Sequence, residues 1–331
     1  MSLRIVLLVT SPRLPAGLLT AQAWDTVRSG PVFAASESDQ AAALRASGVP
    51  VTVLQTDAQG LLDAIAALPG AGAPSPGDPA APAVRTAVWL AGPGGDQDFA
   101  RQLGLRLARE PALAELELMY GSWDPPGARL LDAVAVMDRL VSPGGDPWKR
   151  AQNHRTLAPY LLEESYEAYD AIEQDDLELL REELGDVLLQ VVLHARLAEE
   201  LPDGRAWTVD DVAGVLVEKM IRRNPHVFAG ETATDLEEIT ANWERIKREE
   251  KARESVLDGV ALSQPALSLA AKVLQRAERG GVDAPLPTGD DLGPALLRVV
   301  AEARAAGLDP EAELRRAVLE YARAVREKEK E

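Results

Sequence analysis

Residues 162–200 read LEESYEAYDAIEQDDLELLREELGDVLLQVVLHARLAEE, and they carry the strongest structural signal in the chain. Apolar residues recur at helical spacing on both sides of the acidic break at residues 174–176, which predicts two antiparallel helices joined by a short turn. Side chains three or four positions apart project from the same face of a helix. The first helix therefore presents Glu164 and Glu167 together, and the second presents Glu183 and Asp186.

Closure of this hairpin would place the four carboxylates across a narrow gap. Like charges in partial burial repel one another and lose hydration, so a divalent cation would relieve the cost, and all-oxygen ligands suit Mg²⁺ or Mn²⁺. The residues alone leave a second interpretation open, because acidic pairs on helices are usually solvated faces. A mid-helix glycine costs about 1 kcal/mol relative to alanine. Close packing against the facing helix would explain Gly185.

The acidic pattern resembles the signature of the MazG nucleoside triphosphate pyrophosphohydrolases, with Glu163-Glu164-x-x-Glu167 followed about fifteen residues later by Glu183-x-x-Asp186. The resemblance extends from about Leu130 to Glu331. Family members usually have Cys before an upstream Pro-Trp and Asp after it, where this chain has Asp146 and Lys149. The further blocks, in family order, are Asp146-Pro147-Trp148, Gln152-Asn153-His154, Leu157-x-Pro159-Tyr160-Leu161, Arg222-Arg223-Asn224-Pro225-His226-Val227-Phe228, Trp243-Glu244-x-Ile246-Lys247 and Leu267–Arg276.

This resemblance implies a dimeric, all-α enzyme that uses Mg²⁺ to hydrolyse nucleoside triphosphates to monophosphate and pyrophosphate. Nucleotide-pool house-cleaning in the cytoplasm is the expected role. The implied metal ligands are Glu164, Glu167, Glu183 and Asp186, while Glu163 would position or deprotonate the attacking water. The implied substrate contacts are Lys219, Arg223 and Lys247 at the phosphates, Trp243 at the base or ribose, and His154 nearby.

Other interpretations stay open for several of these residues. Lys219 and Arg223, four apart on one helix face, are either phosphate donors or solvated surface cations, and Trp243 is equally typical of core packing. His194 is expected to be a satisfied core histidine. A non-catalytic helical regulator that binds nucleotides or a partner protein is the alternative function, although a pure binder has no need of a repulsive carboxylate cluster.

Composition narrows the function classes further. The 331 residues carry a formal net charge of −18, which argues against a general nucleic-acid or anionic-membrane surface. The absence of cysteine excludes disulfides and thiolate metal sites. The apolar run Leu3–Thr10 is too short to span a membrane and is expected to be a first strand.

The N-terminal residues alternate between short apolar runs and helical patterns, which predicts a small parallel α/β sheet. This region weakly resembles the N-terminal half of a tetrapyrrole methylase domain, which some MazG proteins carry as a fusion, but it is expected to be too short for methyl transfer. The expected strands are residues 3–10, 31–34, 51–54 and 87–90, with helices at 18–29, 39–47 and 61–68 and a flexible loop at 69–82.

An internal repeat lies near the C-terminus, where residues 290–300 mirror residues 182–192 with Pro294 in place of Asp186. The second copy therefore cannot assemble a group of four carboxylates and is expected to be structural. The chain is expected to end in a frayed tail at residues 326–331. The predicted fold is mainly α, with an all-α MazG-type domain of two related helical units preceded by a small α/β domain. The predicted domains are residues 1–125 (α/β, non-catalytic), 126–265 (catalytic helical unit) and 266–331 (degenerate second unit).

Overall fold

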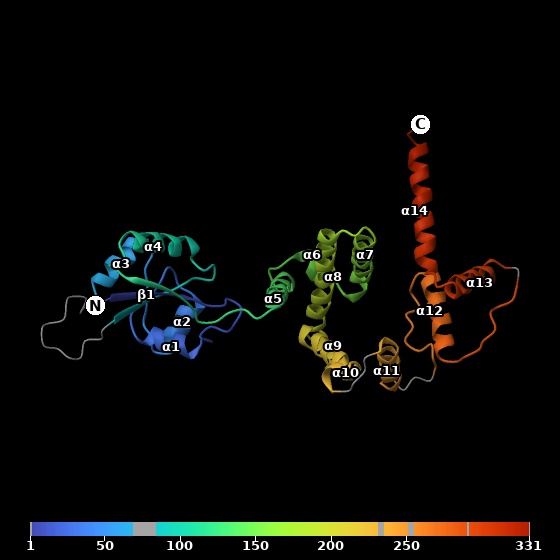
Figure 1. Cartoon of the computed structure of the whole chain (residues 1–331), viewed down its shortest axis with the longest axis horizontal. Helices are drawn as coiled ribbons and strands as arrows, with labels where there is room; N and C mark the ends of the chain where they lie inside the picture. Colours follow the sequence, from blue (N-terminus) through green and yellow to red (C-terminus); the bar gives the residue numbers. More distant parts are fainter. Residues whose placement is uncertain (1, 69–83, 231–234, 251–254, 290, 331) are drawn as a thin grey trace. The chain divides into compact units, whose positions relative to one another are not determined.

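A computed structural model describes residues 2–68, 84–230, 235–250, 255–289 and 291–330 (Figure 1). It divides into two compact units, Met1–Val212 and Ala213–Glu331. The chain is mainly helical and begins with a parallel sheet, as the sequence predicts. The three domain boundaries expected from the sequence stay predictions, and the loop expected at residues 69–82 lies outside the described residues.

The first unit opens with a five-stranded sheet in the order β3-β2-β4-β1-β5, in which every pairing is parallel. The longest pairing joins β1 to β4 over seven residue pairs, from Ser2 and Val84 to Leu8 and Leu90. The strands are β1 (Ser2–Val9), β2 (Val32–Ala34), β3 (Val51–Val53), β4 (Val84–Leu90) and β5 (Glu115–Tyr120).

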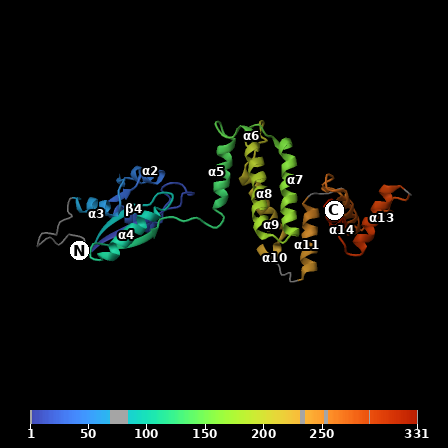
Figure 2. The same ribbon diagram turned by 90° about the horizontal axis from the view of Figure 1, so that it is seen from above.

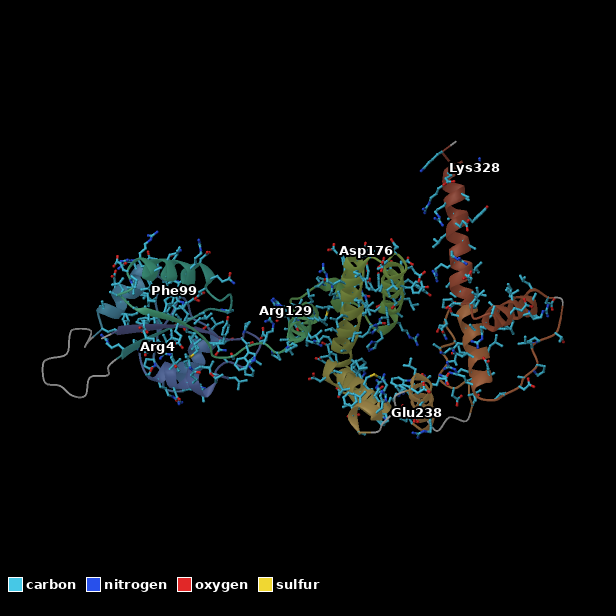
Figure 3. The ribbon with its side chains drawn as sticks, in the orientation of Figure 1. Arg4, Phe99, Arg129, Asp176, Glu238 and Lys328 are labelled. Atoms are coloured by element: carbon cyan, nitrogen blue, oxygen red, sulfur yellow. The ribbon has the colours of Figure 1, made fainter. Side chains whose placement is uncertain are left out.

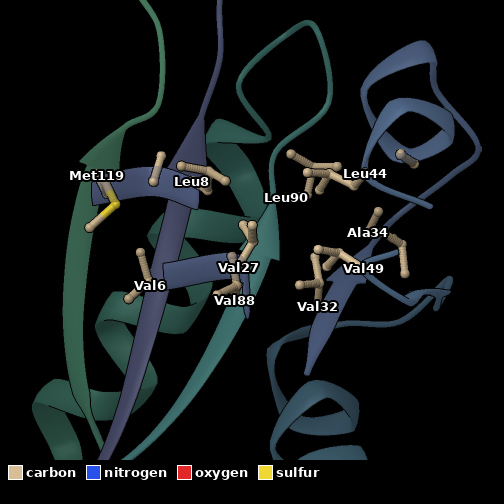
Figure 4. Packing of buried hydrophobic residues seen from close by; sticks show 13 residues of the cluster. Val6, Leu8, Val27, Val32, Ala34, Leu44, Val49, Val88, Leu90 and Met119 are labelled. Carbon is tan, nitrogen blue, oxygen red and sulfur yellow. The ribbon is translucent and has the colours of Figure 1, made fainter. Parts of the chain in front are cut away.

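Helices cover both faces of the sheet, which explains why β1 is a continuous apolar run rather than an alternating one. Val6 and Leu8 face a core shared with α1 (Ala21–Arg28) and α2 (Asp39–Ala46) (Figure 4). Ile5 and Leu7 face the opposite core, shared with α3 (Ala58–Ala66) and α4 (Gln97–Arg109).

Strand β5 was not predicted, because its sequence lacks the continuous apolar run of the other strands. It reads Glu-Leu-Glu-Leu-Met-Tyr and pairs with β1 at the sheet edge. Met119 is buried against the α1 side, whereas Leu118 and Tyr120 are 56% and 57% exposed. Alternation of this kind is typical of a half-covered strand.

The predicted helical hairpin is confirmed as α7 (His154–Glu173) and α8 (Leu177–Ala198), which pack along each other. Figure 2 shows α8 between α7 and α5 (Arg129–Val141). A short helix, α6 (Pro147–Arg150), precedes α7. The core of this helical layer consists of Met137, Val141, Leu157, Val192 and Leu193.

Local hydrogen bonds fix both ends of α7. Asn153 forms a capping box, in which its side chain accepts from the Thr156 N–H while its own N–H donates to Thr156 Oγ1. At the other end, Asp175 adopts a left-handed φ of 56°, and the Asp176 N–H donates to the Ala171 carbonyl, as in a Schellman motif. Asp176 then caps α8 by accepting from two backbone N–H groups, and Figure 3 labels it at the turn.

The remaining helices extend into and fill the second unit. Residues 292–300 of the repeat lie in a helix, and that helix packs against the one before it. The last helix reaches Lys328, so the fraying expected from residue 326 is wrong for residues 326–328. None of the described helices is long and apolar enough to cross a membrane. The elements are α9 (Val209–Arg223), α10 (Pro225–Phe228), α11 (Leu236–Glu249), α12 (Ala266–Arg279), α13 (Leu292–Ala305) and α14 (Pro310–Lys328).

Candidate metal centre

The two arms of the hairpin bring three carboxylates together. Glu164 and Glu167 project from α7 and Glu183 from α8, and each offers an oxygen within 4.8 Å of the others. Glu164 and Glu183 are half-buried, while Glu167 is exposed. The cluster therefore depends on closure of the α7–α8 pair, as the spacing of the acidic residues predicts.

Asp186 lies outside this tight group but close enough to act on it electrostatically. Burial raises the pKa of Glu164, and the charges of Asp186 and Glu167, together with a hydrogen bond to Glu167, raise it further. Burial also raises the pKa of Glu183, with Glu167 and Asp186 adding to the effect. Four carboxylates thus repel one another in partial burial, which is the electrostatic condition that favours a bound cation.

Glu163 and Gly185 lie beside the cluster on the two helices. Glu163 is exposed and adds to the negative field around Glu164. Gly185 is exposed as well, and a Cβ added there would meet nothing within 4 Å. The expectation that Gly185 allows close packing against the facing helix is therefore wrong, because the α8 surface at this position is open.

His154 forms an imidazole pair with His194 on the facing helix. The two Nδ1 atoms lie 2.8 Å apart and the rings are nearly parallel. Trp207 also lies nearly parallel to the His154 ring, with 6.2 Å between centroids. Burial and the neighbouring His154 lower the pKa of His194. The prediction of a satisfied core histidine holds for one nitrogen only, because the buried Nε2 of His194 has no hydrogen-bond partner within the described part of the chain.

The structure does not bring His154 beside the carboxylates. Ten residues of helix separate it from Glu164, which corresponds to about 15 Å of helix rise. His154 lines a cavity of 370 Å³ instead, together with Arg150, Gln152 and Glu200. Its predicted contact with substrate therefore requires a ligand that reaches well beyond the metal centre.

Parts of the lead-in sequence have clear structural roles. Asp146 accepts hydrogen bonds from the Trp148 and Lys149 N–H groups and so caps α6. Tyr160 packs edge-on against Trp148 with 5.7 Å between ring centroids. These residues position the start of α7, which carries Glu164 and Glu167 of the cluster.

In the second unit, Arg223 makes a part-buried ion pair that was not predicted from the sequence. Its Nε and Nη2 atoms donate to both oxygens of Glu250 at 2.5–3.2 Å, and the two side chains are only 10% and 12% exposed. Arg222 donates to the same carboxylate at 2.7 Å. Hydrogen bonds from Arg223, and then from Arg222, lower the pKa of Glu250 to about 2. No motif signals this pair, because 27 residues separate its partners.

Trp243 lies under the same arginine. The Arg223 guanidinium carbon is 5.4 Å from the centre of its ring, and the tryptophan is half-buried. Packing is thus an established role of Trp243, while base or ribose contact stays a prediction. Lys219 and Lys247 are half-buried on α9 and α11, and their predicted phosphate contacts are likewise untested by the geometry.

Comparisons with known proteins point to one family. Residues 152–228 match the model of the MazG nucleotide pyrophosphohydrolase domain, and this range contains the three clustered carboxylates and Asp186. The chain is 42% identical to the nucleoside triphosphate pyrophosphohydrolase of Escherichia coli K12 over 182 residues, which covers 53% of this chain and 68% of the relative.

Two other relatives align over longer stretches. The nucleoside triphosphate pyrophosphohydrolase of Mycolicibacterium smegmatis is 49% identical over 207 residues, covering 62% of this chain and 60% of that protein. An uncharacterized 26.1 kDa protein of Streptomyces cacaoi is 48% identical over 236 residues, covering 71% of this chain and 95% of that protein. The chain thus spans less than two thirds of the mycobacterial relative.

Proposed function

Because the chain belongs to the MazG nucleotide pyrophosphohydrolase family, we propose that it hydrolyses nucleoside triphosphates to nucleoside monophosphate and pyrophosphate. One observation carries the proposal. The carboxylates of Glu164, Glu167 and Glu183 lie within 4.8 Å of one another, and Asp186 adds a fourth negative charge. Carboxylates this close together repel one another and are unfavourable by themselves. Once a cation balances their charge, the group is suited to polyphosphate chemistry.

The donor set fits a hard divalent cation. All four groups offer carboxylate oxygens, which are the ligands that Mg²⁺ and Mn²⁺ prefer. Burial raises the pKa of Glu164 and of Glu183, and repulsion from the neighbouring carboxylates raises it further. Glu164, Glu167, Glu183 and Asp186 would hold the ion. When bound, the cation supplies positive charge that stabilises the charge developing on the phosphate oxygens.

The remaining chemistry falls to residues of the chain itself. Glu163 is exposed one residue from the metal-facing pair, so it can accept a proton from the attacking water. Lys219, Arg223 and Lys247 would donate charge-assisted hydrogen bonds to phosphate oxygens. A homodimer that cleans the nucleotide pool in the cytoplasm is part of the proposal. The dimer is supported by apolar side chains left exposed on the helices, including Leu162, Leu184 and Val217 at 59%, 53% and 54%.

The direct test is release of pyrophosphate from a panel of ribo- and deoxyribonucleoside triphosphates with Mg²⁺, with Mn²⁺ and with EDTA. We expect metal-dependent release of pyrophosphate together with monophosphate, and the panel ranks the bases. Release of single phosphate would identify a different phosphohydrolase. No turnover with either metal would favour the nucleotide-binding regulator.

Replacement of the clustered carboxylates tests the site itself. Glu167→Ala and Asp186→Ala should each lower pyrophosphate release by about 100-fold or more, because each removes a ligand of the ion that stabilises the reaction. Glu173→Ala is the matched control, since Glu173 is an exposed carboxylate at the end of the same helix α7. Normal activity of Glu167→Ala or Asp186→Ala would overturn the assignment.

A further inference from the structure

The guanidinium group of Arg223 is held on two sides. One edge of the group, Nε and Nη2, donates to both oxygens of Glu250, and its carbon atom lies 5.4 Å above the Trp243 ring. A fork of two parallel hydrogen bonds fixes the plane of an arginine as well as its position. The side chain is therefore rigid before any ligand binds.

The remaining edge of Arg223 is available. Among the described residues, the Nη1 atom of Arg223 has no hydrogen-bond partner. This atom is not fully buried, so it reaches solvent. Lys219 lies four residues earlier on the same face of α9. Its ammonium group also makes no hydrogen bond or ion pair within the described part of the chain. Two donors therefore point from one stretch of helix.

The charges in this cluster leave a surplus of positive charge. Arg222 and Arg223 share the single carboxylate of Glu250, so the three groups together carry one net positive charge. Lys219 adds a second. Glu250 thus lowers the cost of burying Arg223 without cancelling the cationic character of the surface, and that character suits a phosphate group.

We propose that Glu250 is a positioning residue for phosphate binding, because it holds Arg223 against Trp243 with Nη1 presented to a phosphate oxygen of the nucleoside triphosphate. The inference rests on the proposed function, which places Arg223 at the substrate. A pre-organised donor loses little conformational freedom when the phosphate binds, so its contribution appears in affinity. Glu250 itself touches no substrate.

The opposite role makes a different prediction. If the Glu250 carboxylate occupied Arg223 in competition with substrate phosphate, its removal would strengthen substrate binding. The two roles therefore differ in the sign of the change in KM. The bidentate geometry and the open Nη1 atom favour positioning, because a phosphate can reach Arg223 without displacing the carboxylate.

The experiment compares Glu250→Gln with wild-type protein in steady-state pyrophosphate release with Mg²⁺. We expect KM to rise about 10-fold, as for loss of one well-placed charged hydrogen bond, with kcat changed by less than about 2-fold. Glu250→Asp keeps the charge and should recover part of the loss. Glu278→Gln is the matched control, because Glu278 forms an exposed ion pair with Arg304 in the same unit. An unchanged or lower KM in Glu250→Gln overturns the inference.

Calorimetric titration with inorganic tripolyphosphate and Mg²⁺ separates this inference from the proposed function. Weaker binding by both Glu250→Gln and Arg223→Gln, with circular dichroism matching the wild type, supports positioning even if wild-type protein releases no pyrophosphate. In that case only the proposed reaction fails. Wild-type hydrolysis together with unaltered tripolyphosphate binding by folded Glu250→Gln removes the inference and leaves the reaction standing.

Discussion

Glu164 shows how a clustered carboxylate can work against the stability of the fold. Its pKa is raised by burial and by the negative charges of Asp186 and Glu167, so the folded protein holds a proton there more tightly than the unfolded chain does. The free energy of unfolding therefore falls as the pH rises through the window from 4.5, the ordinary value, to the raised pKa. At neutral pH the ionised group destabilises the metal-free protein.

Glu164→Gln should accordingly raise the melting temperature of the protein in EDTA at neutral pH, by a few degrees, because the substitution removes a charge and preserves the shape. Mg²⁺ should raise the melting temperature of wild-type protein and have much less effect on the variant. Calorimetric melts with and without Mg²⁺ measure both effects, with Glu173→Gln as the control. A lower melting temperature of Glu164→Gln in EDTA would contradict this account.

Individual residues differ in how far the sequence reveals them. Glu164, Glu167 and Glu183 were predicted because helical spacing relates neighbours in the chain, and the hairpin then needs only one turn to bring them together. Glu250 and the His154–His194 pair were missed, since 27 and 40 residues separate the partners and no local pattern links them. Long-range pairing depends on how helices pack, which residue spacing does not specify.

The same distinction holds among secondary-structure elements. The helices α7 and α8 were predicted because their apolar periodicity is long and an acidic turn separates them. Residues 266–331 were expected to form a helical unit, but α14 was not predicted as a separate helix, although Asp309 caps it and Pro310 occupies its first position. Its exposed apolar residues, among them Leu314 and Tyr321, are interspersed with charges that resemble a solvated tail. Local start signals were present there, but the helix is rich in charged residues and Pro310 is its only buried residue.

At the level of elements, the Arg223–Glu250 pair ties α9 to residue 250 immediately after α11, and its strength should depend on pH. Glu250 has a folded pKa of about 2 against an ordinary value of 4.5, so the unfolded chain binds more protons between these values. Wild-type protein should therefore be more stable than Glu250→Gln at neutral pH. The difference should shrink as the pH falls from 4.5 towards 2.

Urea unfolding followed by circular dichroism, on both proteins across that pH range, measures the difference. Glu278→Gln serves again as the control, because an exposed pair contributes little at any pH. A stability difference that is constant down to about pH 2 would show that the Glu250 charge does not stabilise the fold. Such a result would assign any defect of Glu250→Gln to lost packing.

For the whole molecule, the chemistry that the structure supports is concentrated in helices rather than in the sheet. The carboxyl ends of β1 and β4 are where an open parallel sheet usually binds ligands. Here Asp96 closes the loop after β4 by accepting from the Trp89 indole N–H at 2.9 Å and the Gly92 N–H at 3.2 Å. Phe99 stacks on Trp89, and the cavity beside them measures only 20 Å³.

This cavity is too small for a drug-sized ligand. A pocket for a drug-sized ligand measures about 300 Å³ or more, whereas 20 Å³ is space for a single small molecule such as water. S-adenosylmethionine, the ligand that methyl transfer would need, should therefore leave the melting temperature of the protein unchanged even at millimolar concentration. A nucleoside triphosphate analogue whose phosphate linkage is hydrolysed slowly should raise the melting temperature when Mg²⁺ is present. Phe99→Ala tests whether lack of space alone prevents binding. If the enlarged cavity still does not bind S-adenosylmethionine, polar contacts for this ligand are missing as well. A rise in the melting temperature of wild-type protein with S-adenosylmethionine would restore the methyl-transfer hypothesis and require the sheet edge to open.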